Sequence, residues 1–423
     1  MSHRRAIIRL LTARIDGNVH AVGRFFGGNS REATVLTTKL ARAVIATLLV
    51  SPVLVTGCAK PAVVVLPPAD DSSLSTAASY VASDLAKQLG PARSRRIVID
   101  PLLDRSTGQQ TGTSASVQQE VVSALTAAMA DASIVPFGAD GVEQTGLVLT
   151  GNVASVAAPD QYGINVALTD RVSGLVVAQS AARFRQAGLD NAPTRFYNDS
   201  PSLVRDRSVE GYLKTSETPA GSLADPLYVE QLPTAALISA ALTAYNEGNW
   251  EQALSGYTAA AARPGGQTLR TFNGLYLCNI RLGRASAAED AFGKIAALGL
   301  ATNNLAVKLL FRPGTTDFLA DPAVSGVYPM WIRQIARAAQ TSQSCLNVTG
   351  HTSKSGTEAV NDRLSLARAT AVRDLLGREA PGLERRSRVT GLGFRQNLIG
   401  TGSDDASDAL DRRVEFEVEA CGK

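Results

Sequence analysis

The chain has 423 residues, too many for one ordinary hydrophobic core, and roughly three domains are expected. Its formal net charge is +4, but residues 1–57 hold a surplus of six basic residues, so the rest of the chain has a net charge of about −2. Its composition therefore gives no reason to expect nucleic-acid binding. Beyond residue 57 the only histidine is His351, and there is no metal-type Cys spacing, nucleophile elbow or phosphate loop. We therefore expect no enzyme activity, no cofactor and no metal.

Residues 1–58 are typical of a targeting segment. Lys39 and Arg42 precede an apolar run that is too short to span a bilayer comfortably, and the run closes with Val-Thr-Gly-Cys58. These four residues resemble a bacterial lipobox, which implies lipidation of Cys58 and, with Ala59 following, a lipid-anchored protein on the periplasmic face of the outer membrane. The alternative is an ordinary cysteine after a cleavable signal. Because the Arg-bearing stretch before the run is unusually long, we expect translation to begin near Val35 or Leu36.

Residues 59–74 are rich in Pro, Ala and Asp and predict a tether. Residues 75–187 predict a small α/β domain whose first helix carries apolar residues at helical spacing and ends at Gly90. A second helix is expected to start between Ser116 and Gln119, and strands are expected at 96–100, 133–137, 147–155, 162–170 and 175–184. This order weakly resembles envelope lipoproteins of the CsgG, FlgO and LpoB type.

Two features of this part leave alternatives open. Asp100 and Asp104 follow a predicted strand, and they fit turn residues better than an acid/base or metal pair because no His or Cys lies nearby. Residues 188–232 contain four prolines and little periodicity, which indicates a linker or a long surface excursion.

Residues 233–306 contain a helical pattern that repeats after 35 residues. Small residues lie where helices would touch, and Gly248 and Gly283 lie at equivalent turns, a pattern that resembles tetratricopeptide repeats. Two repeats make only a short groove, so the segment is either a site for a protein partner or a spacer between domains. Cys278 falls at a packing position and is expected to be an inert core thiol.

The stretch from Val348 to Thr370 predicts a strand end, a Gly-rich turn and a helix. Ser355 and Glu358 have capping-box spacing, which places the start of the helix there. Its buried stripe is expected to consist of apolar residues at helical spacing: Val360, Leu364, Ala367, Ala371 and Leu375. Asn361, Ser365 and Arg368 share a different face, which is either a solvated surface or a pocket for a group that carries a carboxylate.

Several motifs along residues 309–420 are similar to the OmpA C-terminal domain: Gly-His-Thr at 350–352, Asn-x-x-Leu-Ser-x-x-Arg-Ala at 361–369, Gly-x-Gly-Phe at 391–394 and Asp-Arg-Arg-Val-Glu-Phe at 411–416. The resemblance implies a βαβαββ sandwich over residues 307–423 that binds peptidoglycan through the diaminopimelate of the stem peptide. By position, the implied ligand residues are Ser353, Asn361, Leu364, Arg368 and Arg413. Ser353 stands where the family usually has Asp, which removes a carboxylate that would pair with the ammonium group of the ligand.

In the fold that the resemblance implies, the last strand lies antiparallel to the strand of Leu346 and Val348. Cys345 and Cys421 would then be neighbours, and we expect a disulfide, which an oxidising periplasm allows. The alternative is two unrelated thiols.

These segments together predict a multidomain α/β plus α protein: an N-terminal small α/β domain, central TPR-like helical hairpins and a C-terminal OmpA-like sandwich. The expected function is an outer-membrane lipoprotein that binds peptidoglycan non-covalently and tethers the membrane to the wall. The alternative is an envelope assembly scaffold whose repeat and N-terminal domain bind protein partners, with weak or no wall binding.

Overall fold

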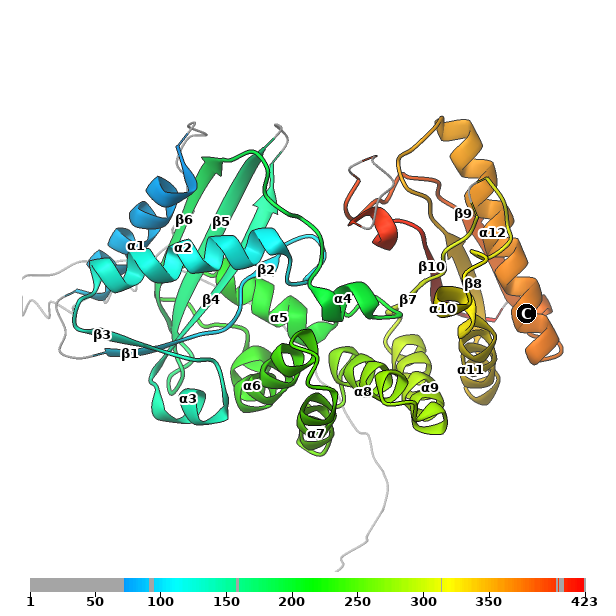
Figure 1. Ribbon diagram of the computed structural model, residues 1–423, viewed down its shortest axis with the longest axis horizontal. Coiled ribbons are helices and arrows are strands. Elements are labelled where there is room, and N and C mark those ends of the chain that lie inside the picture. The colour runs from blue at the N-terminus through cyan, green and yellow to red at the C-terminus, as the bar shows by residue number, and fades with distance from the viewer. Residues whose placement is uncertain are drawn as a thin grey trace, which may run out of the picture. The chain divides into compact units, whose positions relative to one another are not determined.

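The computed structural model describes residues 72–90, 95–156, 160–312, 314–400, 402 and 407–421. The lipobox with Cys58, the expected start near Val35 and most of the tether lie outside these residues. Figure 1 shows mixed α/β architecture followed by helices and then by a C-terminal α/β domain. Within the described ranges, no helix is both long enough and apolar enough to cross a bilayer.

Helix α1 (Leu74–Leu89) has the bounds that its sequence predicts. The side chain of Ser73 accepts a hydrogen bond from the Thr76 amide at the start, and Gly90 ends the helix with φ of 65°. Helix α2 (Gly112–Ala128) begins earlier than predicted. The reason is a capping box, in which the side chains of Thr111 and Ser114 each accept a hydrogen bond from the backbone amide of the other residue. The prediction of a start at Ser116 did not take this local signal into account.

A six-stranded mixed sheet carries these helices. The strands are β1 (Arg95–Ile99), β2 (Leu103–Asp104), β3 (Ala132–Val135), β4 (Leu147–Ser155), β5 (Gln161–Asp170) and β6 (Val176–Arg185), in the order β3-β1-β4-β5-β6 with β2 beside β4. Strand β1 is parallel to β3 and β4, whereas β4, β5 and β6 form an antiparallel meander. Helices α1 and α2 cover one face, where Leu85, Val121 and Val166 are fully buried, and the short helix α3 (Ala139–Gln144) follows β3.

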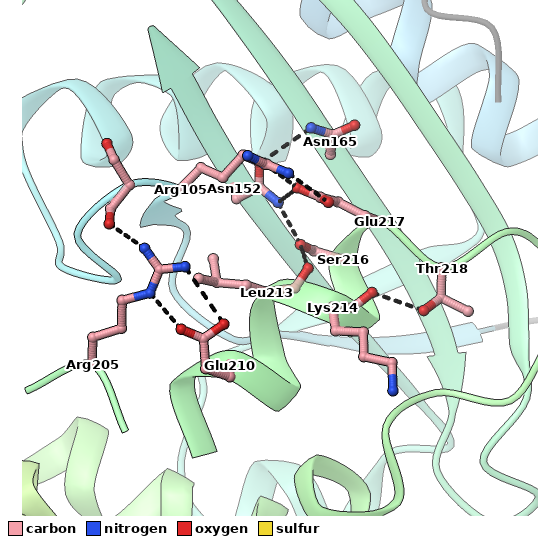
Figure 2. A network of polar contacts seen from close by, with 11 residues as sticks. Arg105, Asn152, Asn165, Arg205, Glu210, Leu213, Lys214, Ser216, Glu217 and Thr218 are labelled. Atoms are coloured by element: carbon pink, nitrogen blue, oxygen red, sulfur yellow. Dashed lines mark hydrogen bonds and ion pairs between the residues drawn. The ribbon is translucent and has the colours of Figure 1, made fainter. Parts of the chain in front are cut away.

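The prediction of a linker at residues 188–232 is wrong. This segment contains α4 (Arg195–Asp199) and α5 (Arg207–Ser216), and its prolines mark helix ends and turns within a packed region. Figure 2 shows the C-terminal end of α5 fixed to the sheet. Asn152 of β4 donates to Ser216 at 2.6 Å and to Glu217 at 3.0 Å, and Glu217 also pairs with Arg105.

The helical segment consists of α6 (Pro226–Asn246), α7 (Trp250–Ala261), α8 (Leu269–Arg281) and α9 (Ala285–Ala301), each packed on the next. Helix α6 begins seven residues before the predicted Pro233, because Asp225 caps it and Pro226 occupies its first turn. Gly248 and Gly283 have φ of 86° and 71°, the left-handed conformation that the two equivalent turns require. The likeness to tetratricopeptide repeats itself stays a prediction.

The C-terminal domain has a four-stranded sheet in the order β7-β10-β8-β9. Its elements are β7 (Leu305–Lys308), α10 (Pro322–Ser325), α11 (Tyr328–Thr341), β8 (Cys345–Gly350), α12 (Glu358–Glu379), η1 (Glu384–Arg386), β9 (Ser387–Gly391), η2 (Ser407–Leu410) and β10 (Arg413–Glu419). The first strand ends at Lys308, because Val307 pairs with Val414 whereas Phe311 makes only an isolated bridge to Phe318.

Strand β10 lies antiparallel to β8, with Glu419 opposite Cys345, as the resemblance implies. The structure contains the disulfide between Cys345 and Cys421, with Cα atoms 5.2 Å apart. Cys278 is a buried free thiol, and burial raises its pKa to about 12, which fits an inert packing role.

Candidate functional site

Helix α12 buries its polar face, and the predicted apolar stripe is wrong. Asn361, Ser365 and Arg368 are at most 5% exposed, whereas Val360 is 49% exposed. Of the other stripe residues, Ala367 is exposed and three are only half-buried: Leu364, Ala371 and Leu375. The helix starts at Glu358 after Thr357, which makes no side-chain cap, so the predicted capping box is also wrong. Periodicity defines the faces of a helix, but the sheet and loops around it decide which face is buried.

Arg368 is held beneath the loop that follows Phe311. Its Nε donates to the carbonyl oxygen of Thr315 at 3.1 Å and its Nη2 to that of Arg312 at 3.4 Å. Its guanidinium carbon lies 4.7 Å from the centroid of the Phe311 ring, within cation–π range. These contacts fix the guanidinium in one orientation.

Asn361 and Ser365 each fix a further loop to the same helix face. The side-chain amide of Asn361 donates to the carbonyl oxygens of Ser355 at 2.7 Å and Thr357 at 3.0 Å. Ser365 Oγ accepts a 2.9 Å hydrogen bond from the Gly393 amide. One rigid helix thus organises three loops, the arrangement in which binding residues commonly occur.

Two strand-end glycines allow this close contact between α12 and the sheet. A Cβ at Gly350 would collide with the carbonyl oxygen of Ser365, and one at Gly391 would lie 2.5 Å from the amide nitrogen of Leu366. Neither position can hold a larger residue unless the helix shifts. The glycines of the two motif segments thus set the depth at which Arg368 and Asn361 lie.

Ser353 lies in the loop between β8 and α12 and is 4% exposed. Its Oγ is 3.4 Å from Ser355 Oγ, and Ser355 in turn provides a carbonyl oxygen to Asn361. Ser353 and Asn361 are therefore brought together through one loop. Leu364 is half-buried on the same helix, between Asn361 and Arg368 in sequence.

Arg413 lies on β10 and is joined to a partly buried charged group, Glu415, that sequence reasoning did not use. Its Nε donates to Glu415 at 2.7 Å, and Glu415 lies 3.5 Å from Nε2 of the fully buried His351. Burial alone would raise the pKa of Glu415, but the contacts with His351 and Arg413 outweigh it and lower the pKa to about 2. Arg413 also donates to the carbonyl oxygen of Gln396 at 3.2 Å, so it helps to hold the loop after β9 that Ser365 also contacts.

Asp411 is another contributor that sequence reasoning missed, although it opens the last motif. Its carboxylate is fully buried and accepts from the amides of Leu398, Ile399 and Gly400 at 2.7, 3.1 and 2.8 Å. This cap fixes the loop that follows β9. The pattern Asp-Arg-Arg carried the signal, but only the fold shows which amides the carboxylate meets.

Within the described residues, no three His, Cys, Asp or Glu side chains are close enough to hold a metal ion. Asp104 accepts from the Thr107 amide at 2.8 Å and from two hydroxyl groups, which fits a turn residue. Asp100 instead accepts from the hydroxyl of Tyr228 at 2.9 Å inside the protein, and burial raises its pKa to about 7.

Comparison with known proteins gives a family match for the C-terminal part of the chain: residues 311–409 match the OmpA family. Outer membrane porin F of Pseudomonas aeruginosa is 40% identical over 85 residues, which are 20% of this chain and 24% of that relative. The chain therefore matches about a quarter of the length of this relative.

Two solved structures are also similar to this part. The cell wall anchor of the T6SS from Pseudomonas aeruginosa is 25% identical with a TM-score of 0.22, over 26% of this chain and 77% of that chain. The OmpA-like domain of FopA1 from Francisella tularensis subsp. tularensis SCHU S4 is 23% identical with a TM-score of 0.21, over 26% of this chain and 70% of that chain.

Proposed function

Because residues 311–409 form an OmpA family domain, we propose that this chain binds peptidoglycan non-covalently through the loops around α12. The relatives named above are an outer membrane porin and a cell wall anchor, and both names belong to proteins of the cell envelope. We extend the location in the cell envelope to this chain, which is similar to these two proteins only in its C-terminal domain.

The burial of Arg368 and Asn361 carries the proposal. A helix that buries a guanidinium while Val360 is half exposed gives up stability, because burying a charge is costly and burying a valine is favourable. Such a conflict between local preference and fold is expected where a site is selected for binding. The carboxylate of a diaminopimelate stem peptide matches the guanidinium in charge and geometry.

Ser353 sets the strength of this binding in the proposal. A hydroxyl at this position offers the ammonium group of the ligand a neutral hydrogen bond in place of an ion pair. We therefore propose wall binding that is weaker than in a domain with Asp at this position.

Lipidation of Cys58 would supply the second attachment. The sequence Val-Thr-Gly-Cys58 supports an outer-membrane anchor, and multiple acyl chains give the stable membrane binding that one chain does not. Membrane fractionation tests this part: Cys58→Ser should move the protein from the membrane to the soluble periplasmic fraction. Equal membrane association of the two forms would show that Cys58 is not the anchor.

Sedimentation with purified sacculi tests the wall-binding part. Wild type should pellet with sacculi, Arg368→Ala should remain in the supernatant, and Ser353→Asp should pellet at lower sacculus concentration. Arg363→Ala is the matched control, because Arg363 is exposed on the same helix and should behave as wild type. If wild type stays in the supernatant, the proposal of wall binding is wrong. If only Ser353→Asp pellets, the natural domain is a module of an assembly scaffold instead.

A further inference from the structure

A groove of about 390 Å³ lies where the helical segment meets the C-terminal domain. Helix α8, the end of α4, strand β7 and helices α10 and α11 contribute the residues that line it, and Figure 1 labels each of these elements. Its lining shares no residue with the peptidoglycan site proposed above. Its lining includes basic groups (Arg281, Lys308 and Arg412), aliphatic groups (Ile280, Leu310, Val324 and Val327) and aromatic groups (Tyr276, Tyr328 and Trp331).

Lys308 is one of the basic groups that line this groove. Its ammonium donates to the carbonyl oxygens of Tyr197 at 3.0 Å and Asn198 at 2.7 Å, which belong to the last turn of α4. An ammonium has three N–H donors, and in the part of the chain that the structure describes no carboxylate contacts this one. Burial lowers the pKa of Lys308 to about 8, so the group is still charged at neutral pH.

The carboxylate in the lining, that of Asp199, is already engaged. Asp199 accepts from Arg281 Nη2 at 2.5 Å and from the hydroxyl of Tyr245 at 2.8 Å. It raises the pKa of Lys308 only from a distance. The lining therefore has one acidic and three basic side chains, and the acidic one is paired with Arg281.

The walls around Lys308 are partly exposed and apolar. Ile280 is 38% exposed, and Leu310, Val324 and Val327 are half-buried. The groove therefore combines a cation with partly exposed aliphatic surface. It suits an acidic side chain that is flanked by aliphatic ones.

We propose that this groove binds an acidic, aliphatic peptide segment of a partner protein, with one carboxylate of the segment on Lys308. The carboxylate accepts a hydrogen bond from the third N–H of the ammonium. The aliphatic neighbours of the carboxylate pack against Ile280 and Val324. This interaction is separate from wall binding, and it assigns a surface to a protein partner.

Fluorescence anisotropy with two matched probes tests the proposal. The first is a fluorescein-labelled, C-terminally amidated peptide, Gly-Leu-Val-Asp-Val-Leu-Gly-Gly, and the second has Asn in place of Asp. The Asp peptide should bind saturably, and the Asn peptide should bind about tenfold more weakly, as expected for loss of one charge-assisted hydrogen bond. Lys308→Met should abolish the difference, whereas Lys294→Met, an exposed lysine on α9, should preserve it.

A second variant covers the case in which Lys308→Met does not fold. Ile280→Glu alters an exposed residue at the rim of the groove, so this variant should fold. Its added carboxylate should weaken binding of the Asp peptide more than binding of the Asn peptide, because like charges repel. Equal binding of the two peptides to wild type, no saturation below about 1 mM, or unchanged discrimination in both variants would overturn the proposal. Inorganic phosphate that competes as well as the Asp peptide would also overturn it, because the groove would then be a simple anion site. Sacculus sedimentation of Ile280→Glu should match wild type, which separates this proposal from wall binding.

Discussion

The indole Nε1 of Trp331 donates a 2.9 Å hydrogen bond to the hydroxyl oxygen of Tyr276, which lies 55 residues earlier in the chain. Trp331 also stacks on Phe292, with ring centroids 5.3 Å apart. These contacts join α11 of the C-terminal domain to α8 and α9 of the helical segment. The buried cluster continues from there to Val348 and Phe416 of the C-terminal sheet, so the two segments share one hydrophobic core.

Loss of the Trp331 side chain should destabilise both segments at once. We expect Trp331→Ala to lower the free energy of unfolding by about 3–5 kcal/mol, because a large buried side chain is removed. Tyr276→Phe should cost about 1–3 kcal/mol, since it leaves a buried indole N–H without its acceptor. Urea unfolding followed by circular dichroism checks both values. Two separate transitions in wild type would contradict a shared core.

The approach of α12 to the sheet should not tolerate a methyl group at Gly350. Gly350→Ala should cost about 1–3 kcal/mol and weaken sacculus binding, because the new Cβ collides with the carbonyl oxygen of Ser365 and displaces the helix that carries Arg368. Gly163→Ala is the control, as no neighbouring heavy atom lies within 4 Å of its added Cβ. Thermal melts together with sedimentation measure the two effects. Equal behaviour of the two variants would show that the close contact is unimportant.

The disulfide should stabilise the C-terminal domain. Its cysteines are separated by 76 residues, and replacing both with Ser should lower stability by about 4 kcal/mol in the chain-entropy model. Urea unfolding with and without reductant should show this difference for wild type and none for the double variant. Cys278→Ser should keep the dependence on reductant, because Cys278 is a free thiol. Identical peptide masses with and without reductant would mean that Cys345 and Cys421 are not bonded.

Asp100 should make the stability of the α/β domain depend on pH. The pKa of Asp100 is raised from 3.8 to about 7, and burial is the largest cause of this shift. The hydrogen bond from Tyr228 and the charge of Arg270 both lower the pKa, but they do not offset the effect of burial. The proton is therefore bound more tightly in the folded state. The stability contributed by protonation of Asp100 is fully present below about pH 4. This contribution, up to about 4 kcal/mol, is lost as the pH rises through about 7.

The Asp100→Asn variant checks this dependence. An amide keeps an acceptor for the Tyr228 hydroxyl but cannot ionise, so the free energy of unfolding should vary less between pH 5 and pH 8 than in wild type. Urea unfolding at four pH values in this range provides the comparison. Parallel pH profiles for the two proteins would assign the dependence to other groups.

Local signals in the sequence determined the helices and strands that have clear capping or turn residues at their ends and a regular pattern of apolar residues. Helix α1 has the predicted bounds because Ser73 and Gly90 act within one turn of the helix they limit. Strand β4 also matches its prediction, since an apolar run between turn residues defines it. The motif residues around Asn361 and Arg368 were identified by resemblance, because their order along the chain is specific even though each residue alone is not.

Only the tertiary structure decided which surfaces face inward. Spacing grouped Asn361 with Arg368 and Val360 with Leu364, but it could not tell that the polar group is buried, because that depends on glycines and carbonyl oxygens far away in sequence. The role of residues 188–232 was hidden for the same reason, as the partners of Ser216 and Glu217 lie on β4 and near β2. The environment of the Lys308 ammonium likewise depends on the contact between β7 and the end of α4. Local patterns specify elements, whereas long-range contacts specify the environment of each side chain.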